Sequence, residues 1–155
     1  MPRRSAGLLV HRERSGEREV LLVHPGGPMW AKRDAGAWSI PKGEYDSSED
    51  PLAAAKREFE EELGTAAPDG PVKDLGEIKQ KSGKIVSAWA VAGDLDVTEI
   101  TSNTVEVQWP PRSGKMLEIP EVDRAEWFPI HEAREKINPA QAELLDRLAE
   151  ILDIA

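Results

Sequence analysis

The chain has 155 residues, of which 39% are hydrophobic and 32% are charged. This balance is typical of one folded domain spanning residues 1–155, and it excludes a disordered chain or a fibre. The formal net charge of −9 opposes binding to a polyanion such as duplex DNA, so we expect no nucleic acid polymer as partner. The absence of cysteine excludes disulfides, thiol catalysis and zinc–thiolate sites.

Nothing in the sequence indicates a membrane or an export route. No stretch approaches the ~18 apolar residues that a membrane span needs. The apolar run at residues 6–10 is too short for a signal peptide. We therefore expect a soluble, cytoplasmic protein.

The N-terminal part predicts a hairpin followed by a loop. Residues 6–11 and 19–24 are short β-type runs, separated by a charged turn. A segment rich in proline and glycine follows at 25–37 and predicts a loop. A third short strand is predicted at 38–40, ended by Pro41.

One helix is predicted clearly, between an N-cap signal at Asp50 and Pro51 and a stop signal at Gly64. After it, alternating patterns predict four strands and a helical tail of one or two amphipathic helices. The strands are expected at 72–79, 84–92, 105–109 and 124–128, and the tail at 131–154. Strands on both sides of a central helix indicate an α/β (α+β) fold with a mixed sheet between helical layers.

The central helix carries acidic side chains on one face. At ~100° per residue, Glu58, Glu61 and Glu62 project to one side of the apolar stripe that contains Phe59, and Glu60 to the other. Acidic residues on a helix usually just face water. Here, however, like charges crowded beside the core repel one another. Magnesium, which binds oxygen ligands, would relieve that repulsion.

The segment at residues 43–65, GEYDSSEDPLAAAKREFEEELGT, resembles the Nudix box, G-x5-E-x7-R-E-U-x-E-E-x-G-U, where U is a bulky apolar residue. Thr65 departs from the pattern at its last apolar position. The positions that match are Gly43, Glu49, Arg57, Glu58, Phe59, Glu61, Glu62 and Gly64. The resemblance implies the Nudix fold, an α/β/α sandwich containing a loop-helix-loop.

The resemblance also implies roles for these residues in a magnesium-dependent hydrolase, with manganese as a substitute. Glu58, Glu61, Glu62 and the carbonyl of Gly43 would be metal ligands. Glu49 and Arg57 would hold the loop and orient the carboxylates. The general base would be either Glu58 or Glu121, because family members differ in this respect.

The flanking segments bear on the substrate. Residues 38–43, WSIPKG, resemble Nudix enzymes acting on dinucleoside polyphosphates and on diphosphoinositol polyphosphates, and imply that Lys42 approaches the phosphate chain. The spacing of Glu121 and Trp127 also resembles asymmetric diadenosine tetraphosphate hydrolases. Those enzymes stack adenine on a tyrosine after the box, and this chain has none there. Trp30, Trp89 or Trp109 would have to replace it.

Several alternatives stay open. Arg112 and Lys115 would either bind an outer phosphate or remain solvated. The leading prediction is a hydrolase that cleaves a nucleoside polyphosphate, with a dinucleoside polyphosphate preferred. Its alternatives are a diphosphoinositol polyphosphate substrate, a (d)NTP substrate, or a Nudix module that binds a nucleotide without cleaving it. The sequence is compatible with a monomer or a homodimer.

Overall fold

The computed structural model describes residues 3–98 and 100–152. Its elements occur in the order β1 (Arg4–Arg14), β2 (Glu17–Pro25), β3 (Lys42–Glu44), α1 (Pro51–Leu63), β4 (Val72–Lys79), β5 (Ile85–Ala92), β6 (Thr104–Gln108), β7 (Met116–Pro120), β8 (Val122–Pro129), α2 (Ile130–Lys136), the short 3₁₀ helix η1 (Pro139–Gln141) and α3 (Ala142–Ile151). No helix within these residues is long and apolar enough to span a membrane.

A six-stranded mixed sheet forms the centre of the fold. Its strand order is β4-β5-β1-β2-β8, and β3 pairs with β1 off this path. β1 runs parallel to β5 and antiparallel to β2 and β3. The long β1 therefore joins the two halves of the sheet, and β3 brings the start of the Nudix-like segment against it.

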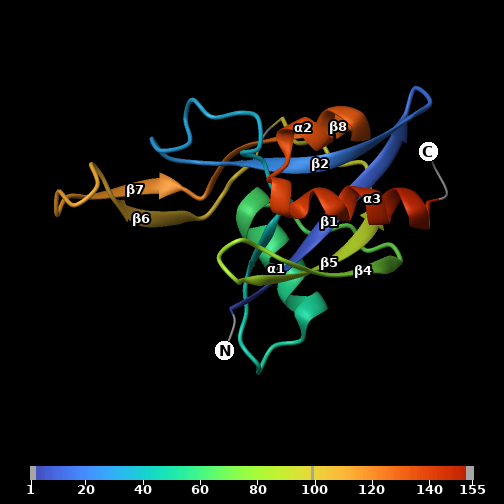
Figure 1. The fold of residues 1–155 in the computed structure, drawn as a ribbon, viewed down its shortest axis with the longest axis horizontal. Coiled ribbons are helices and arrows are strands. Elements are labelled where there is room, and N and C mark those ends of the chain that lie inside the picture. The colour runs from blue at the N-terminus through green and yellow to red at the C-terminus, as the bar shows by residue number, and fades with distance from the viewer. Residues whose placement is uncertain (1–2, 99, 153–155) are drawn as a thin grey trace.

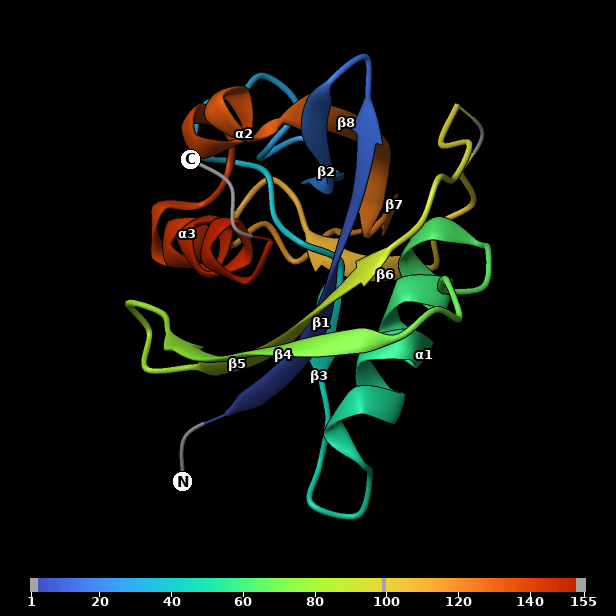
Figure 2. The same ribbon diagram turned by 90° about the vertical axis from the view of Figure 1, so that its right-hand side faces the viewer.

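Helices cover both faces of this sheet (Figures 1 and 2). Successive β1 residues point to opposite faces: Leu8 packs in one core cluster with Phe59 of α1, and Leu9 in another with Leu145 of α3. The sequence-based expectation of a mixed sheet between helical layers is confirmed, and the layers are those of an α/β/α sandwich.

Helix α1 begins and ends where its capping residues predict. Asp50 accepts a hydrogen bond from the backbone N–H of Ala53, which satisfies one of the free donors at a helix N-terminus. Gly64 ends the helix with φ of 75°, a conformation that glycine adopts without strain. The two caps therefore fix where α1 begins and ends, and with it which of its acids, Glu58 and Glu62, are buried.

The predicted strand at residues 38–40 is wrong. These residues form only isolated bridges, Val23 with Ser39 and Trp38 with Ile137, and the strand of this region is β3, after Pro41. Trp38 is almost fully buried and makes edge contacts with His24 and Phe128. A buried aromatic residue is common in strands, but Trp38 lies in a loop and packs into the core from there.

The C-terminal half contains one strand that the patterns did not predict. β7 pairs with β6 in a separate two-stranded sheet, and this hairpin projects away from the main body (Figure 1).

The tail forms two helices with η1 between them, in agreement with the expected one or two helices. The predicted end of the tail at residue 154 lies outside the described residues.

Candidate functional site

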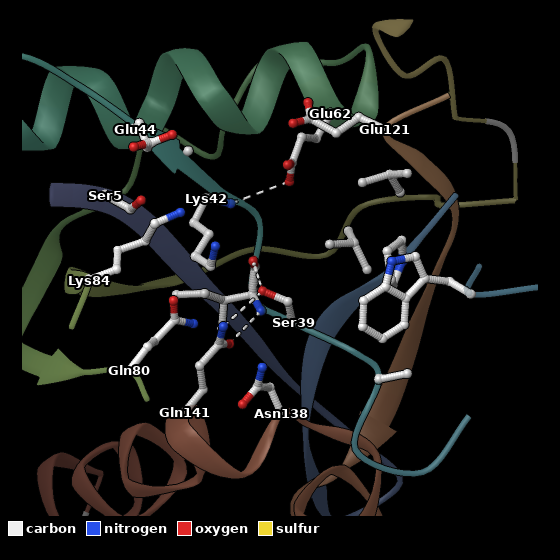
Figure 3. Close-up of a pocket in the computed structure, with 17 residues that line it drawn as sticks. Ser5, Ser39, Lys42, Glu44, Glu62, Gln80, Lys84, Glu121, Asn138 and Gln141 are labelled. Atoms are coloured by element: carbon white, nitrogen blue, oxygen red, sulfur yellow. Dashed lines mark hydrogen bonds between the residues drawn. The ribbon is translucent and has the colours of Figure 1, made fainter. Parts of the chain in front are cut away.

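A pocket of about 290 Å³ opens at the point where the Nudix-like segment meets β1, the β4–β5 turn and η1. Figure 3 shows its polar side chains, with Glu62 and Glu121 at one end, Ser5, Gln80 and Lys84 at the other, and Lys42 between them. The complete lining is Ser5, Val23, Pro25, Trp30, Ala37, Ser39, Ile40, Lys42, Gly43, Glu44, Glu62, Gln80, Lys84, Glu121, Val122, Asn138 and Gln141.

Glu62 is the buried acid of this pocket. Its residue is only 6% exposed, and its carboxylate accepts a hydrogen bond of 3.3 Å from the backbone N–H of Lys42. Burial raises the pKa of Glu62 to about 8, and the negative charge of Glu121 acts in the same direction. Without a cation, the pocket therefore favours the protonated form of this carboxyl.

Glu58 lies one helical turn before Glu62 and packs directly on β3. Burial raises the pKa of the Glu58 carboxyl, although its hydrogen bond from Arg57 acts in the opposite direction. A Cβ atom at Gly43 would lie 2.0 Å from the Glu58 carboxyl carbon. Only glycine allows the β3 backbone to pass so close to this acid.

Arg57 contacts the loop before α1 and two acids of the helix. Its guanidinium donates two hydrogen bonds to Glu49, of 2.8 and 2.9 Å. It also donates to Glu58 at 2.8 Å and to Glu61 at 3.2 Å. These bonds raise the pKa of Arg57 and link the loop before α1 to two of its carboxylates.

The acidic side chains fit a hard divalent cation by their chemistry. Among the described residues no three acidic or histidine side chains are already gathered around one point, and Arg57 instead holds Glu58 and Glu61. Nevertheless Glu58 and Glu62 are buried carboxyl groups with oxygen donor atoms, and the charge of Glu121 disfavours ionisation of both. A magnesium or manganese ion would neutralise that repulsion. The residues present are therefore compatible with the ion that the Nudix-like pattern implies.

The pocket also contains cations and amides. Burial lowers the pKa of the Lys42 ammonium, and the charge of Lys84 acts in the same direction. Gln141, which is fully buried, accepts from the backbone N–H of Ile40 and donates to the Ser39 hydroxyl, both at 3.0 Å. This places the WSIPKG segment firmly beside the pocket.

Sequence reasoning missed five polar lining residues: Ser5, Gln80, Lys84, Asn138 and Gln141. They come from β1, the β4–β5 turn and the segment around η1, so no local spacing connects them. The parallel pairing of β1 with β5, in which Ser5 faces Val86, brings β1 beside the β4–β5 turn.

The predicted aromatic and basic substrate contacts divide into two groups. Trp30 lines the pocket, on a loop whose Arg33 carbonyl accepts a hydrogen bond of 2.6 Å from buried His24. Trp109, Arg112 and Lys115 are not among the lining residues. They lie at the turn of the β6–β7 hairpin, where the Trp109 N–H donates to the Lys115 carbonyl.

Comparison with known proteins identifies relatives by sequence. The RNA pyrophosphohydrolase of Rhizobium meliloti is 35% identical over 116 residues, which are 66% of this chain and 64% of that protein. The RNA pyrophosphohydrolase of Rhodospirillum rubrum is 39% identical over 67 residues, 41% of this chain and 39% of its own length. The chain thus matches less than two thirds of the length of either relative.

Solved structures show the same fold at low sequence identity. The binary complex of a C. elegans Ap4A hydrolase has a TM-score of 0.67 at 22% identity, covering 97% of this chain and 98% of that one. The NUDIX domain of Shewanella oneidensis NrtR, complexed with ADP ribose, has a TM-score of 0.68 at 14% identity, covering 98% and 89%. A family model, described as the NUDIX domain, matches residues 1–148. On this match, and with the Nudix-like segment folded as the loop and helix beside its pocket, the chain belongs to the Nudix family.

Proposed function

We propose that the protein is a magnesium-dependent hydrolase that cleaves a phosphoanhydride linkage in a nucleoside polyphosphate. The observation that carries this proposal is one pocket lined by the buried carboxyl of Glu62 and by the lysines Lys42 and Lys84. Carboxylates alone would repel a phosphate chain, and lysines alone would bind it without activating water. Manganese should substitute for magnesium, since it accepts the same oxygen ligands.

The chain's own residues would divide the chemistry as follows. Glu58, Glu61 and Glu62, with the Gly43 carbonyl, would hold the metal ions, which supply charge neutralisation and acidify a bound water. Lys42 would bind the phosphate chain. Either Glu58 or Glu121 would take the proton as the water oxygen bonds to phosphorus. The bridging P–O bond then breaks, and its oxygen leaves with the departing phosphate.

A dinucleoside polyphosphate is the substrate that we favour. The WSIPKG segment supports this choice, as does Trp30, an aromatic lining residue of the pocket that we expect to stack on a base. The C. elegans Ap4A hydrolase also shares the fold over nearly its whole length, although that likeness by itself concerns the fold alone.

A second candidate is the 5′ polyphosphate end of an RNA. It is favoured by the two relatives named RNA pyrophosphohydrolase, at 35% and 39% identity over their matched regions. The net charge of −9 counts against extended contact with an RNA strand, because like charges repel. An RNA substrate would therefore be held mainly by its terminal phosphates.

A substrate panel tests both candidates. Diadenosine tetraphosphate, ATP, ADP-ribose, a diphosphoinositol polyphosphate and a 5′-triphosphorylated oligoribonucleotide are compared by kcat/KM, with magnesium and with EDTA. We expect magnesium-dependent hydrolysis, fastest for diadenosine tetraphosphate. Water labelled with heavy oxygen then identifies the phosphorus attacked. Absence of hydrolysis across the panel, together with measurable nucleotide binding, would instead indicate a binding module.

A further inference from the structure

The hydroxyl of Ser5 is buried without a partner. Ser5 is 0% exposed, and among the described residues its Oγ is the only buried side-chain nitrogen or oxygen that lacks a hydrogen bond. Leaving such a group without a bond costs free energy. Since Ser5 also lines the pocket, a ligand in the pocket can supply the missing partner.

Two lysines line neighbouring parts of the pocket, Lys42 in the middle and Lys84 at the end that contains Ser5. Figure 3 shows the side chain of Lys84 extending toward that of Lys42 within the pocket. Neither forms an ion pair with any other described residue, whereas Lys136, for example, is paired with Asp34. Two ammonium groups held close together repel each other, so an anion between them would be stabilising.

The neighbouring groups suit an anion rich in oxygen. The amide of Gln80 lines the pocket beside Lys84 (Figure 3) and can donate two hydrogen bonds. One acid, Glu44, lies at this end as well. Its side chain is 53% exposed and is 3.8 Å from Arg3, so solvent and that cation screen its charge.

We propose that Ser5, Gln80 and Lys84 form a second phosphate subsite, which binds the phosphate group next to the one held by Lys42. This inference rests on the proposed function, and it specifies the substrate class further. The carboxylates lie at one end of the pocket, Lys42 in the middle and the new subsite at the far end. A substrate that fills all three positions carries at least three phosphates in a row.

The consequence is selectivity by the length of the phosphate chain. Diadenosine tetraphosphate, ATP and a 5′-triphosphorylated RNA can occupy the subsite while a bond is cleaved beside the carboxylates. ADP-ribose, with two phosphates, leaves Ser5 and Lys84 without a ligand. The ratio of kcat/KM for diadenosine tetraphosphate to that for ADP-ribose should therefore depend on Lys84.

The direct test measures binding of inorganic tripolyphosphate by calorimetry, with calcium and with EDTA. Lys84→Met should weaken binding by about tenfold or more, and Ser5→Ala by about threefold to tenfold, as loss of one charged or one neutral hydrogen bond requires. Lys81→Met is the matched control, because Lys81 is exposed in the same turn and does not line the pocket. It should bind as the unchanged protein does.

If Ser5 had a purely structural role, Ser5→Ala would lower the melting temperature of the protein without ligand. The subsite predicts otherwise. Ser5→Ala removes a hydroxyl that has no partner in the protein, so without ligand its melting temperature should not fall, and only the increase produced by tripolyphosphate should shrink. The subsite is overturned if Lys84→Met binds tripolyphosphate as tightly as the unchanged protein, or if the unchanged protein binds none in either buffer. Tight binding without hydrolysis of any nucleotide would leave the subsite standing and refute the proposed function.

Discussion

At the scale of single residues, the site depends on acids that the fold keeps away from water. Glu62 and Glu58 are 6% and 7% exposed, although a carboxylate in water would be more stable than one in a protein interior. Glu60, on the same helix, is exposed. The difference between Glu62 and Glu60 is therefore one of position on α1, and it separates a buried acid from a surface acid.

Removing the charge at these two positions should have unequal effects on turnover. Glu62→Gln should lower kcat by roughly 100-fold while the fold is retained, since it removes one oxygen ligand that neutralises charge in the transition state. Glu60→Gln should leave kcat nearly unchanged. Steady-state kinetics with magnesium measure both. Equal losses would refute the assignment of the metal site to the buried face of α1.

The pKa of Glu62 predicts how stability depends on pH in the absence of metal. Its folded-state pKa of about 8 lies above the unfolded value of 4.5, so the folded state binds the proton more tightly. The stabilisation is fully present below pH 4.5 and is lost as pH rises through about 8. In EDTA, the melting temperature should therefore be lower at pH 9 than at pH 6.

Glu62→Gln provides the control, because glutamine carries no titrating proton. The decrease in melting temperature between pH 6 and pH 9 should be smaller in this variant than in the unchanged protein. Parallel melting curves over this pH range would show that Glu62 does not titrate there. Glu60→Gln should keep the full decrease.

At the scale of elements, the sequence predicted the parts that carry local signals. Asp50, Pro51 and Gly64 mark both ends of α1, and the helical period placed Glu58, Glu61 and Glu62 on one side of its apolar stripe. The structure buries Glu58 and Glu62 and leaves Glu61 exposed beside Arg57. The strand preceding this helix was predicted a few residues before β3. The reason is that tryptophan is common in strands, whereas Trp38 is buried in the core and forms only an isolated bridge. β7 was missed because most of its residues are exposed, so it lacks the alternating pattern of a half-buried strand.

The pocket's far end could not have been predicted from local patterns. Ser5, Lys84 and Gln141 are placed by the pairing of β1 with β5 and by the packing of η1 against residues 39 and 40. Each is an ordinary polar residue in its own segment. They line one pocket only after the sheet has formed, whereas Glu58 and Glu62 are neighbours in the sequence itself.

Variants of the β6–β7 hairpin should show which of the two candidate substrates the protein cleaves. Its turn carries Arg112 and Lys115 outside the pocket, where a long RNA could reach and a dinucleotide held by its phosphates would contact less. Charge reversal at both positions should lower kcat/KM several-fold for a triphosphorylated RNA and by less than about twofold for diadenosine tetraphosphate.

A matched pair of exposed lysines distinguishes a local contact from a change in net charge. Lys56→Glu with Lys79→Glu alters the formal charge by the same amount on α1 and β4. This variant should affect RNA hydrolysis less than the hairpin variant does. If the hairpin variant loses activity equally on both substrates, the turn contacts the dinucleotide as well, as the sequence first suggested for Arg112 and Lys115.

At the scale of the whole molecule, the formal charge of −9 means that any added salt should stabilise the fold, because it screens the repulsion between acids. Specific metal binding must be separated from this general effect. Magnesium chloride and sodium chloride are therefore compared at equal ionic strength, by urea unfolding at pH 7.

Magnesium should stabilise the protein more than sodium does at the same ionic strength. A ligand that binds only the folded state at 100 times its dissociation constant adds about 2.7 kcal/mol to the free energy of unfolding. The excess over sodium chloride should approach that size in the unchanged protein and in Glu60→Gln. It should shrink in Glu62→Gln, since this change removes an expected metal ligand, whereas Glu60→Gln removes only a surface carboxylate. Identical stabilisation by the two salts would mean that the acids of α1 respond only to screening, and the proposed metal site would have to be abandoned.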